Sequence, residues 1–221
     1  MQCRHRKDKH WVMQHSGTSG MQRLMGKSQY TSGFAHLTSC YLFSRNIFSV
    51  QGEQRGNTRG YCIWVTVPYD LLDRGYTNQV CLDFSTVVVE SMKLRYSDKQ
   101  PQIEWQAGDV RDMTGIIETK SVDVAFDKST LDPMIYGNPW SPPDDVLGNT
   151  ARYMAEVGNT DLQNKVLRVL KDDGVFLCIT FRQPHFVKPI INRANEWEVA
   201  VEVMGDRGSL QYFGFVLRKV K

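Results

Sequence analysis

Three aspartates stand where apolar runs of the sequence end, and their carboxylates suit the binding of one nucleoside-like ligand. Asp83 suits a ribose, because one carboxylate can accept hydrogen bonds from both sugar hydroxyls. Asp109 can accept a hydrogen bond from the amino group of an adenine, with the backbone of Val110 alongside. Asp127 would face whatever occupies the mouth of the cleft. The competing explanation for each aspartate taken singly is a cap on the following helix or turn.

The elements that must position these aspartates alternate between strand and helix from about residue 69 onward. Buried strands are predicted over residues 79–84, 102–107, 121–126 and 175–180, with helices after Ser85 and from Thr160 to Leu170. This alternation is typical of a parallel sheet with crossover helices. In such sheets ligands bind beyond the carboxyl ends of the strands, which is where the three aspartates fall.

The C-terminal part of the sequence breaks this alternation. Residues 197–204 and 210–220 read as two strands in succession, separated only by the turn residues 205–209. A connection that short requires antiparallel pairing. The predicted architecture is therefore an α/β sheet that is mainly parallel and ends in an antiparallel hairpin.

The net charge of +3 conceals two segments of opposite sign. Residues 1–60 contain nine Lys or Arg against two acids, a net charge of +7, whereas residues 61–221 carry −4. The first segment is rich in glycine and serine and lacks clear periodicity. We therefore divide the chain into a basic, poorly ordered N-terminal segment, residues 1–68, and a folded domain, residues 69–221.

Composition restricts the class of protein. Hydrophobic residues make up 41% of the chain, which is incompatible with wholesale disorder, and no run approaches the ~18 apolar residues of a membrane span. The five cysteines are scattered without metal-ligand spacing, so we predict no metal site. Free cysteines favour a reducing compartment, and we expect a cytoplasmic protein.

The order of these elements resembles that of the class I S-adenosylmethionine-dependent methyltransferases, whose seven-stranded sheet ends in an antiparallel hairpin. The run Asp127-Lys128-Ser129-Thr130-Leu131-Asp132 is similar to the Asp-Lys-Gly-Thr-Leu-Asp signature of one branch, which contains the elongation factor 1-alpha lysine methyltransferases. Further matches follow in order at Leu72–Thr77, Asp83–Ser85, Gly108–Val110, Arg168–Leu170, Pro184–Phe186 and Tyr212–Lys219. The resemblance covers about residues 69–221.

This resemblance implies a Rossmann-like fold and an enzyme that methylates a protein lysine, with S-adenosylmethionine as cofactor and a protein as partner. Asp83, followed by Phe84, would bind the cofactor ribose, and Asp109 with Val110 would bind the adenine. Asp127 would lie near the methyl acceptor as the candidate catalytic residue. The resemblance also suggests the acceptor side for His185, for which a role at a helix start or in packing is an equal alternative.

The sequence departs from the family at its glycine-rich first motif. The corresponding position is Tyr61-Cys62-Ile63-Trp64-Val65, where bulky side chains replace the glycines that let a backbone approach the cofactor. Pro68 disfavours the helix that should follow. We therefore expect the first strand and its glycine loop to be irregular or absent, as an alternative exon or misread frame would produce.

Three other functions stay open on the residues alone. A catalytically impaired isoform or pseudoenzyme would keep the sheet as an interaction module without the cofactor. The basic N-terminal segment could contact nucleic acid, although its cations are dispersed without interleaved aromatic residues, which makes nucleic acid an improbable partner. A nicotinamide dehydrogenase would also use an acid like Asp83, but its glycine fingerprint is missing and the terminal hairpin favours the methyltransferase.

Overall fold

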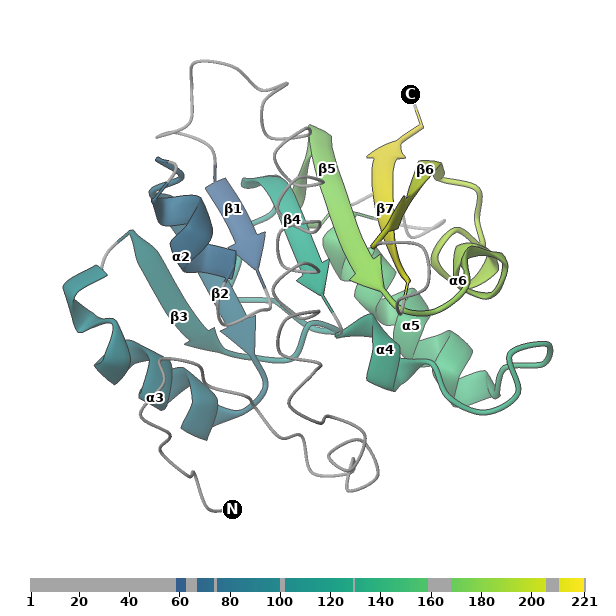
Figure 1. Ribbon diagram of the computed structural model, residues 1–221, viewed down its shortest axis with the longest axis horizontal. Helices are drawn as coiled ribbons and strands as arrows, with labels where there is room; N and C mark the ends of the chain where they lie inside the picture. The colour runs from purple at the N-terminus through teal and green to yellow at the C-terminus, as the bar shows by residue number, and fades with distance from the viewer. Residues whose placement is uncertain are drawn as a thin grey trace.

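The computed structural model describes residues 59–62, 67–73, 75–99, 102–128, 130–158, 168–205 and 211–220. They form a seven-stranded sheet in the order β3-β2-β1-β4-β5-β7-β6 (Figure 1). The strands are β1 (Arg59–Cys62), β2 (Asn78–Asp83), β3 (Ile103–Ala107), β4 (Val122–Lys128), β5 (Leu170–Thr180), β6 (Trp197–Met204) and β7 (Tyr212–Lys219). The helices are α2 (Val67–Leu72), α3 (Thr86–Arg95), the 3₁₀ turn η3 (Ser97–Lys99), α4 (Leu131–Met134), α5 (Asp144–Val157) and α6 (Pro184–Ile191).

The pairing of the strands confirms the predicted fold class. Strands β1 to β5 are parallel, and their arrowheads point to the same edge of the sheet in Figure 1. Strand β7 runs antiparallel to both β5 and β6, which is the predicted terminal hairpin. The sheet is thus mainly parallel, and one edge collects the carboxyl ends of five strands.

Helices cover both faces of this sheet, and each face has its own core. On one face, Tyr153 and Val157 of α5 and Val187 of α6 pack against sheet residues such as Phe176 and Phe215. On the opposite face the core of α2, α3 and the sheet contains Leu71, Val89, Met92, Cys81 and Leu177. Layers of this kind bury nearly every side chain of a central strand, so strands such as residues 175–180 read as unbroken apolar runs.

The first strand differs in detail from the expectation. A four-residue strand, β1, pairs with both β2 and β4 at the place where the sequence predicted an irregular or absent strand. Of the position predicted for the glycine motif, residues 61–65, the first two lie in β1, and the rest lie outside the described residues, as do residues 1–58. The division at residue 68 stays a prediction, although the sheet itself begins at Arg59.

The expectation that Pro68 prevents a helix was wrong. Pro68 lies buried in the first turn of α2, where a proline removes only an N–H that has no intrahelical partner. The amide of Gln79, at the start of β2, donates to the carbonyl oxygens of Pro68 (2.9 Å) and Tyr76 (2.7 Å). Helix α2 then ends before Gly75, whose φ of +89° is in the left-handed region that favours glycine.

The structure differs from the sequence-based expectation in two elements, helix α5 and the start of strand β5. Asp144 and Asp145, read as part of a proline-rich loop, open α5, because acids in a first turn complement the helix dipole. Leu170, predicted to lie in a helix, begins β5, where Val122 N donates to the carbonyl oxygen of Val169 (2.9 Å). Pairing with β4 outweighs the helical spacing of these apolar residues.

Candidate functional site

The carboxyl edge of the parallel strands contains a reversal of strand order. Strand β1 lies between β2 and β4, so the chain proceeds to one side of β1 through β2 and β3 and then crosses to the other side at β4. Ligands of open α/β sheets bind in the crevice at such a reversal, outside the carboxyl ends of the strands. The segments after β2, β3, β4 and β5 therefore define the candidate site.

Asp83 is the last residue of β2 and is 8% exposed. Its Oδ1 accepts a hydrogen bond from the backbone N–H of Ser85 (2.8 Å), and the Ser85 hydroxyl in turn caps α3 by accepting from Val88 N (3.4 Å). Phe84, between them, is 71% exposed. The carboxylate thus has a fixed direction at the helix start, and an aromatic ring stands in solvent beside it.

Gly108 brings the ends of β2 and β3 close together. Its N–H donates to the carbonyl oxygen of Asp83 (3.0 Å), directly after the last register pair of the two strands, Asp83 with Ala107. A Cβ at position 108 would lie 2.4 Å from Cδ1 of Ile116, so a larger residue would require the end of that side chain to move. The next residue but one, Val110, buries its side chain in the core and leaves only its backbone to meet a ligand.

Asp109 is engaged by a neighbouring arginine. Arg111 donates from its backbone N (2.8 Å) and Nε (2.9 Å) to Oδ1, and from Nε (3.0 Å) and Nη2 (2.6 Å) to Oδ2. Its Nη1 also donates to Oδ1 of Asn149 on α5 (2.8 Å). These hydrogen bonds hold the pKa of the Asp109 carboxyl below its usual value. No pattern in the sequence indicates this pairing.

Asp127 lies in β4, one residue before its end, and has no exposed surface. Its Oδ1 accepts from the backbone N–H of Thr130 (3.0 Å), and its Oδ2 accepts from the hydroxyl of Tyr153 on α5 (3.0 Å). Burial raises the pKa of this carboxyl from the ordinary 3.8 to about 7. The carboxylate holds the turn after β4, and its predicted catalytic role stays a prediction.

Asp132, the second acid of the Asp127–Asp132 motif, joins the turn after β4 to the turn after β5. Its Oδ1 is hydrogen bonded to the Thr180 hydroxyl, and the backbone N–H of Arg182 also donates to that hydroxyl (3.0 Å). The Arg182 guanidinium donates hydrogen bonds to the carbonyl oxygens of Asp132 (3.0 Å) and Ile135 at the end of α4. Sequence reasoning identified the motif but missed Thr180 and Arg182, which lie about fifty positions away.

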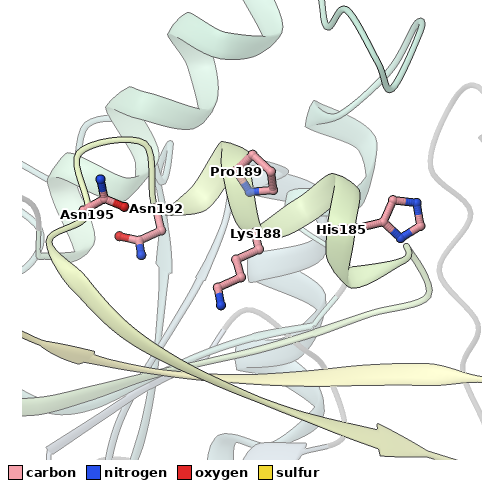
Figure 2. A pocket seen from close by; sticks show the side chains of 5 residues that line it. All are labelled: His185, Lys188, Pro189, Asn192 and Asn195. Atoms are coloured by element: carbon pink, nitrogen blue, oxygen red, sulfur yellow. The ribbon is translucent and has the colours of Figure 1, made fainter.

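His185 stands in the first turn of α6 and is exposed. Its ring lies 3.9 Å from that of Phe186 and 6.1 Å from that of Trp140, measured between centroids. It also borders an open hollow of about 220 Å³ along α6 (Figure 2). Figure 2 shows His185 at one end of this hollow and Asn192 and Asn195 at the other, so these side chains do not converge on one small ligand.

Two further searches were confined to the described part of the chain. No group of three His, Cys, Asp or Glu side chains there is placed to hold a metal ion. None of the helices in these ranges combines the length and the apolar character needed to cross a membrane.

Comparison with known proteins gives matches to curated proteins and to solved structures. No family model matches the chain. It is 32% identical over 120 residues to EEF1A lysine methyltransferase 4 of Mus musculus, covering 53% of this chain and 42% of that protein. It is 33% identical over 135 residues to the eEF1A lysine and N-terminal methyltransferase of Danio rerio, covering 61% of this chain and 17% of that protein. The chain thus spans less than half the length of these curated relatives.

Solved structures share the fold at low sequence identity. A protein assigned as a methyltransferase, in complex with the Haloferax volcanii Trm112 methyltransferase activator, has a TM-score of 0.54 and 13% identity, covering 88% of this chain and 93% of that one. The [4+2]-cyclase SpnF has a TM-score of 0.53 and 10% identity, and the match covers 75% of this chain and 76% of that one. Because a cyclase shares this architecture, the fold alone does not determine the reaction. The chain has the fold of the class I methyltransferases, and its sequence is related to those of the eEF1A lysine methyltransferases.

Proposed function

We propose that the protein transfers a methyl group from S-adenosylmethionine to a lysine side chain of a protein of the eEF1A type, in the cytoplasm. The observation that carries the proposal is the adjacency of Asp83 and Asp109 at the reversal of strand order, joined by the hydrogen bond from Gly108. The names of the relatives support a protein lysine as the acceptor. The described cysteines, Cys81 and Cys178, form no disulfide, which agrees with a reducing compartment.

The residues of this edge fit the two ends of a nucleoside. A carboxylate offers about four acceptor sites, so Asp83 can keep its bond from Ser85 N and still accept from ribose hydroxyls. Phe84, next to Asp83, has an exposed ring, and the backbone of Val110 follows Asp109. Asp109 differs, because the four bonds from Arg111 already use its acceptor sites. An adenine amino group would have to displace at least one of them.

The bound cofactor would supply a methyl group on a positively charged sulfur. The protein then has to bring a neutral lysine amine in line with that methyl group, although a free lysine has a pKa of about 10.4. Asp127 is enclosed by protein, so its part is to fix the turn that borders the acceptor rather than to touch the amine. Orientation of this turn and exclusion of water are the contributions we assign to these residues.

Calorimetric titration of the full-length chain with S-adenosylhomocysteine tests the cofactor site. We expect one site, with Asp83→Ala weakening binding about tenfold to a hundredfold, because charged hydrogen bonds contribute about 1.5–3 kcal/mol. Asp172→Ala is the matched control, since this exposed aspartate lies in β5 before the run that leads to the carboxyl edge. A folded wild-type chain that releases no binding heat at high ligand concentration would refute the proposal and favour the interaction module.

The same titration tests the adenine end. Arg111→Ala is expected to tighten binding several-fold, because the Asp109 carboxylate no longer has to exchange partners. Asp109→Ala is expected to weaken it. Equal weakening by both substitutions would mean that the Arg111–Asp109 pair is itself the binding element. Mass spectrometry of recombinant eEF1A, incubated with the chain and S-adenosylmethionine, tests the transfer, and it should find methylated lysine only with the active chain.

A further inference from the structure

An aromatic and acidic surface lies beside the candidate site, on the connection between α4 and α5 and on the start of α6. It contains Tyr136, Trp140, Asp144, Asp145, His185 and Phe186, and we call it the Trp140 surface. Trp140 is 79% exposed. In Figure 1 the connection between α4 and α5 projects beyond the carboxyl edge of the sheet, past the ends of β4 and β5.

Local hydrogen bonds and ring contacts keep Trp140 in this exposed position. Its backbone N–H donates to Oδ1 of Asn138 (3.0 Å), which forms a turn within the connection. Its ring meets the edge of Phe186 at a centroid distance of 4.9 Å and an interplanar angle of 84°. Because Phe186 belongs to α6, the indole is fixed against a helix while most of its surface faces solvent.

Exposed aromatic side chains gather here in an amount that needs an explanation. Single exposed apolar residues are normal, whereas contiguous apolar surface marks an interaction site. Tyr136 is half exposed, and its hydroxyl is hydrogen bonded to the carboxylate of Asp145 in the first turn of α5. One aromatic ring is thus bound to an acid of α5, and the rings of Trp140, His185 and Phe186 form a second contact group at the start of α6.

The charge of this connection selects the kind of partner. Residues 129–151 contain neither lysine nor arginine, and of their three aspartates Asp132 is buried beside Arg182, so only the other two contribute exposed charge. Asp144 and Asp145 are exposed, and aromatic faces attract cations through their quadrupole. Such a surface repels nucleic acid and favours a positively charged peptide segment.

We propose that the Trp140 surface binds a basic, lysine-bearing segment of the acceptor protein and guides it toward the carboxyl ends of β4 and β5. The identity of the partner as an acceptor rests on the proposed function, whereas the binding of a basic segment does not. Trp140 is the central contact, and Asp144 with Asp145 supplies the electrostatic attraction.

The test measures binding of two fluorescent peptides to the full-length chain by anisotropy. One peptide alternates lysine with glycine, and the other carries glutamate in place of every lysine. We expect the lysine peptide alone to bind, and Trp140→Ala to weaken it about tenfold, as for a buried aromatic anchor of an interface. Asp144→Asn combined with Asp145→Asn should weaken it about threefold and reduce its sensitivity to salt.

Leu94→Ala serves as the matched control, because it also removes an exposed apolar side chain (80% exposed), but from α3. Equal binding of both peptides, or an unchanged affinity in Trp140→Ala, would overturn the inference. Titration with S-adenosylhomocysteine separates the two hypotheses. Peptide binding that depends on Trp140 in a chain without cofactor binding would leave the docking surface standing and remove the proposed function. Cofactor binding without peptide binding would leave the proposed function standing and remove the docking surface.

Discussion

Replacing Asp127 by asparagine is expected to remove a pH dependence from the free energy of unfolding. Asp127 has no exposed surface, and burial raises its pKa from 3.8 to about 7. Asparagine keeps the shape of the side chain, since its oxygen can accept from Thr130 N and its amide can donate to the oxygen of Tyr153. The variant should therefore fold, and its side chain does not titrate.

The direction of this pH dependence follows from which state, folded or unfolded, binds the proton on Asp127 more tightly. Between about pH 4 and pH 7 the folded state keeps the proton on Asp127 and the unfolded state has lost it, so the stability of the wild type falls as the pH rises. A rise of about three pKa units corresponds to about 4 kcal/mol in total. Between pH 5 and pH 8 the part that is lost is about 2 to 3 kcal/mol.

The assay is urea unfolding of both proteins at several pH values from 5 to 8. The difference between the free energies of unfolding of the wild type and Asp127→Asn cancels the other titrating groups. We expect this difference to fall by about 2 to 3 kcal/mol over the range. Asp172→Asn is the control, because the hydrogen bond from Lys120 lowers the pKa of this exposed carboxyl and keeps it ionised throughout. A difference between the wild type and Asp127→Asn that stays constant from pH 5 to pH 8 would refute the reasoning, since the buried carboxyl would then be ionised at pH 5.

Three further substitutions test the contacts that shape the site, each by chemical unfolding. Gly108→Ala should cost no more than about 1 kcal/mol, because the end of the half-buried Ile116 side chain can move away from the new Cβ, whereas Gly148→Ala has open space in α5 and should not destabilise the protein. Arg182→Met should lower stability by about 1–3 kcal/mol through two lost bonds to backbone carbonyl oxygens, and no loss would show that these bonds are replaced by water. Gln79→Leu should leave the carbonyl oxygens of α2 and its loop without their donor and lower the thermal midpoint by several degrees, and an unchanged midpoint would contradict this.

The parallel sheet and its terminal hairpin were predictable because their signals are local. Apolar runs end in aspartates at Asp83 and Asp109, and the turn residues between β6 and β7 are too few for a crossover. Helix α5 was missed because prolines precede it, although Pro143 lies immediately before its first residue, where proline is tolerated. Leu170 was assigned to a helix because its pairing partner, Val122, lies far away in the sequence.

The side-chain partners at the site could not be predicted for a similar reason. Arg111 is two residues from Asp109, yet nothing in the sequence distinguishes an arginine that pairs with a binding carboxylate from one that faces solvent. The pairing of Asp132 with Thr180 joins two strand ends that only the fold brings together. A motif thus predicted where the site lies, whereas the state of each carboxylate depended on contacts made by the tertiary structure.

The two acids of the Asp127–Asp132 motif both point inward, and this gives the turn after β4 two separable functions. Asp127 fixes Thr130, and Asp132 connects to Thr180, so the inner side of the turn is held by buried bonds. The outer side continues into the exposed ring of Trp140, which makes no buried bond of this kind. Substitution of Asp127 should therefore change stability and its pH dependence, and substitution of Trp140 should change peptide binding at constant stability. A loss of stability in Trp140→Ala as large as that of a core substitution would contradict this separation, because the ring would then belong to the core rather than to a docking surface.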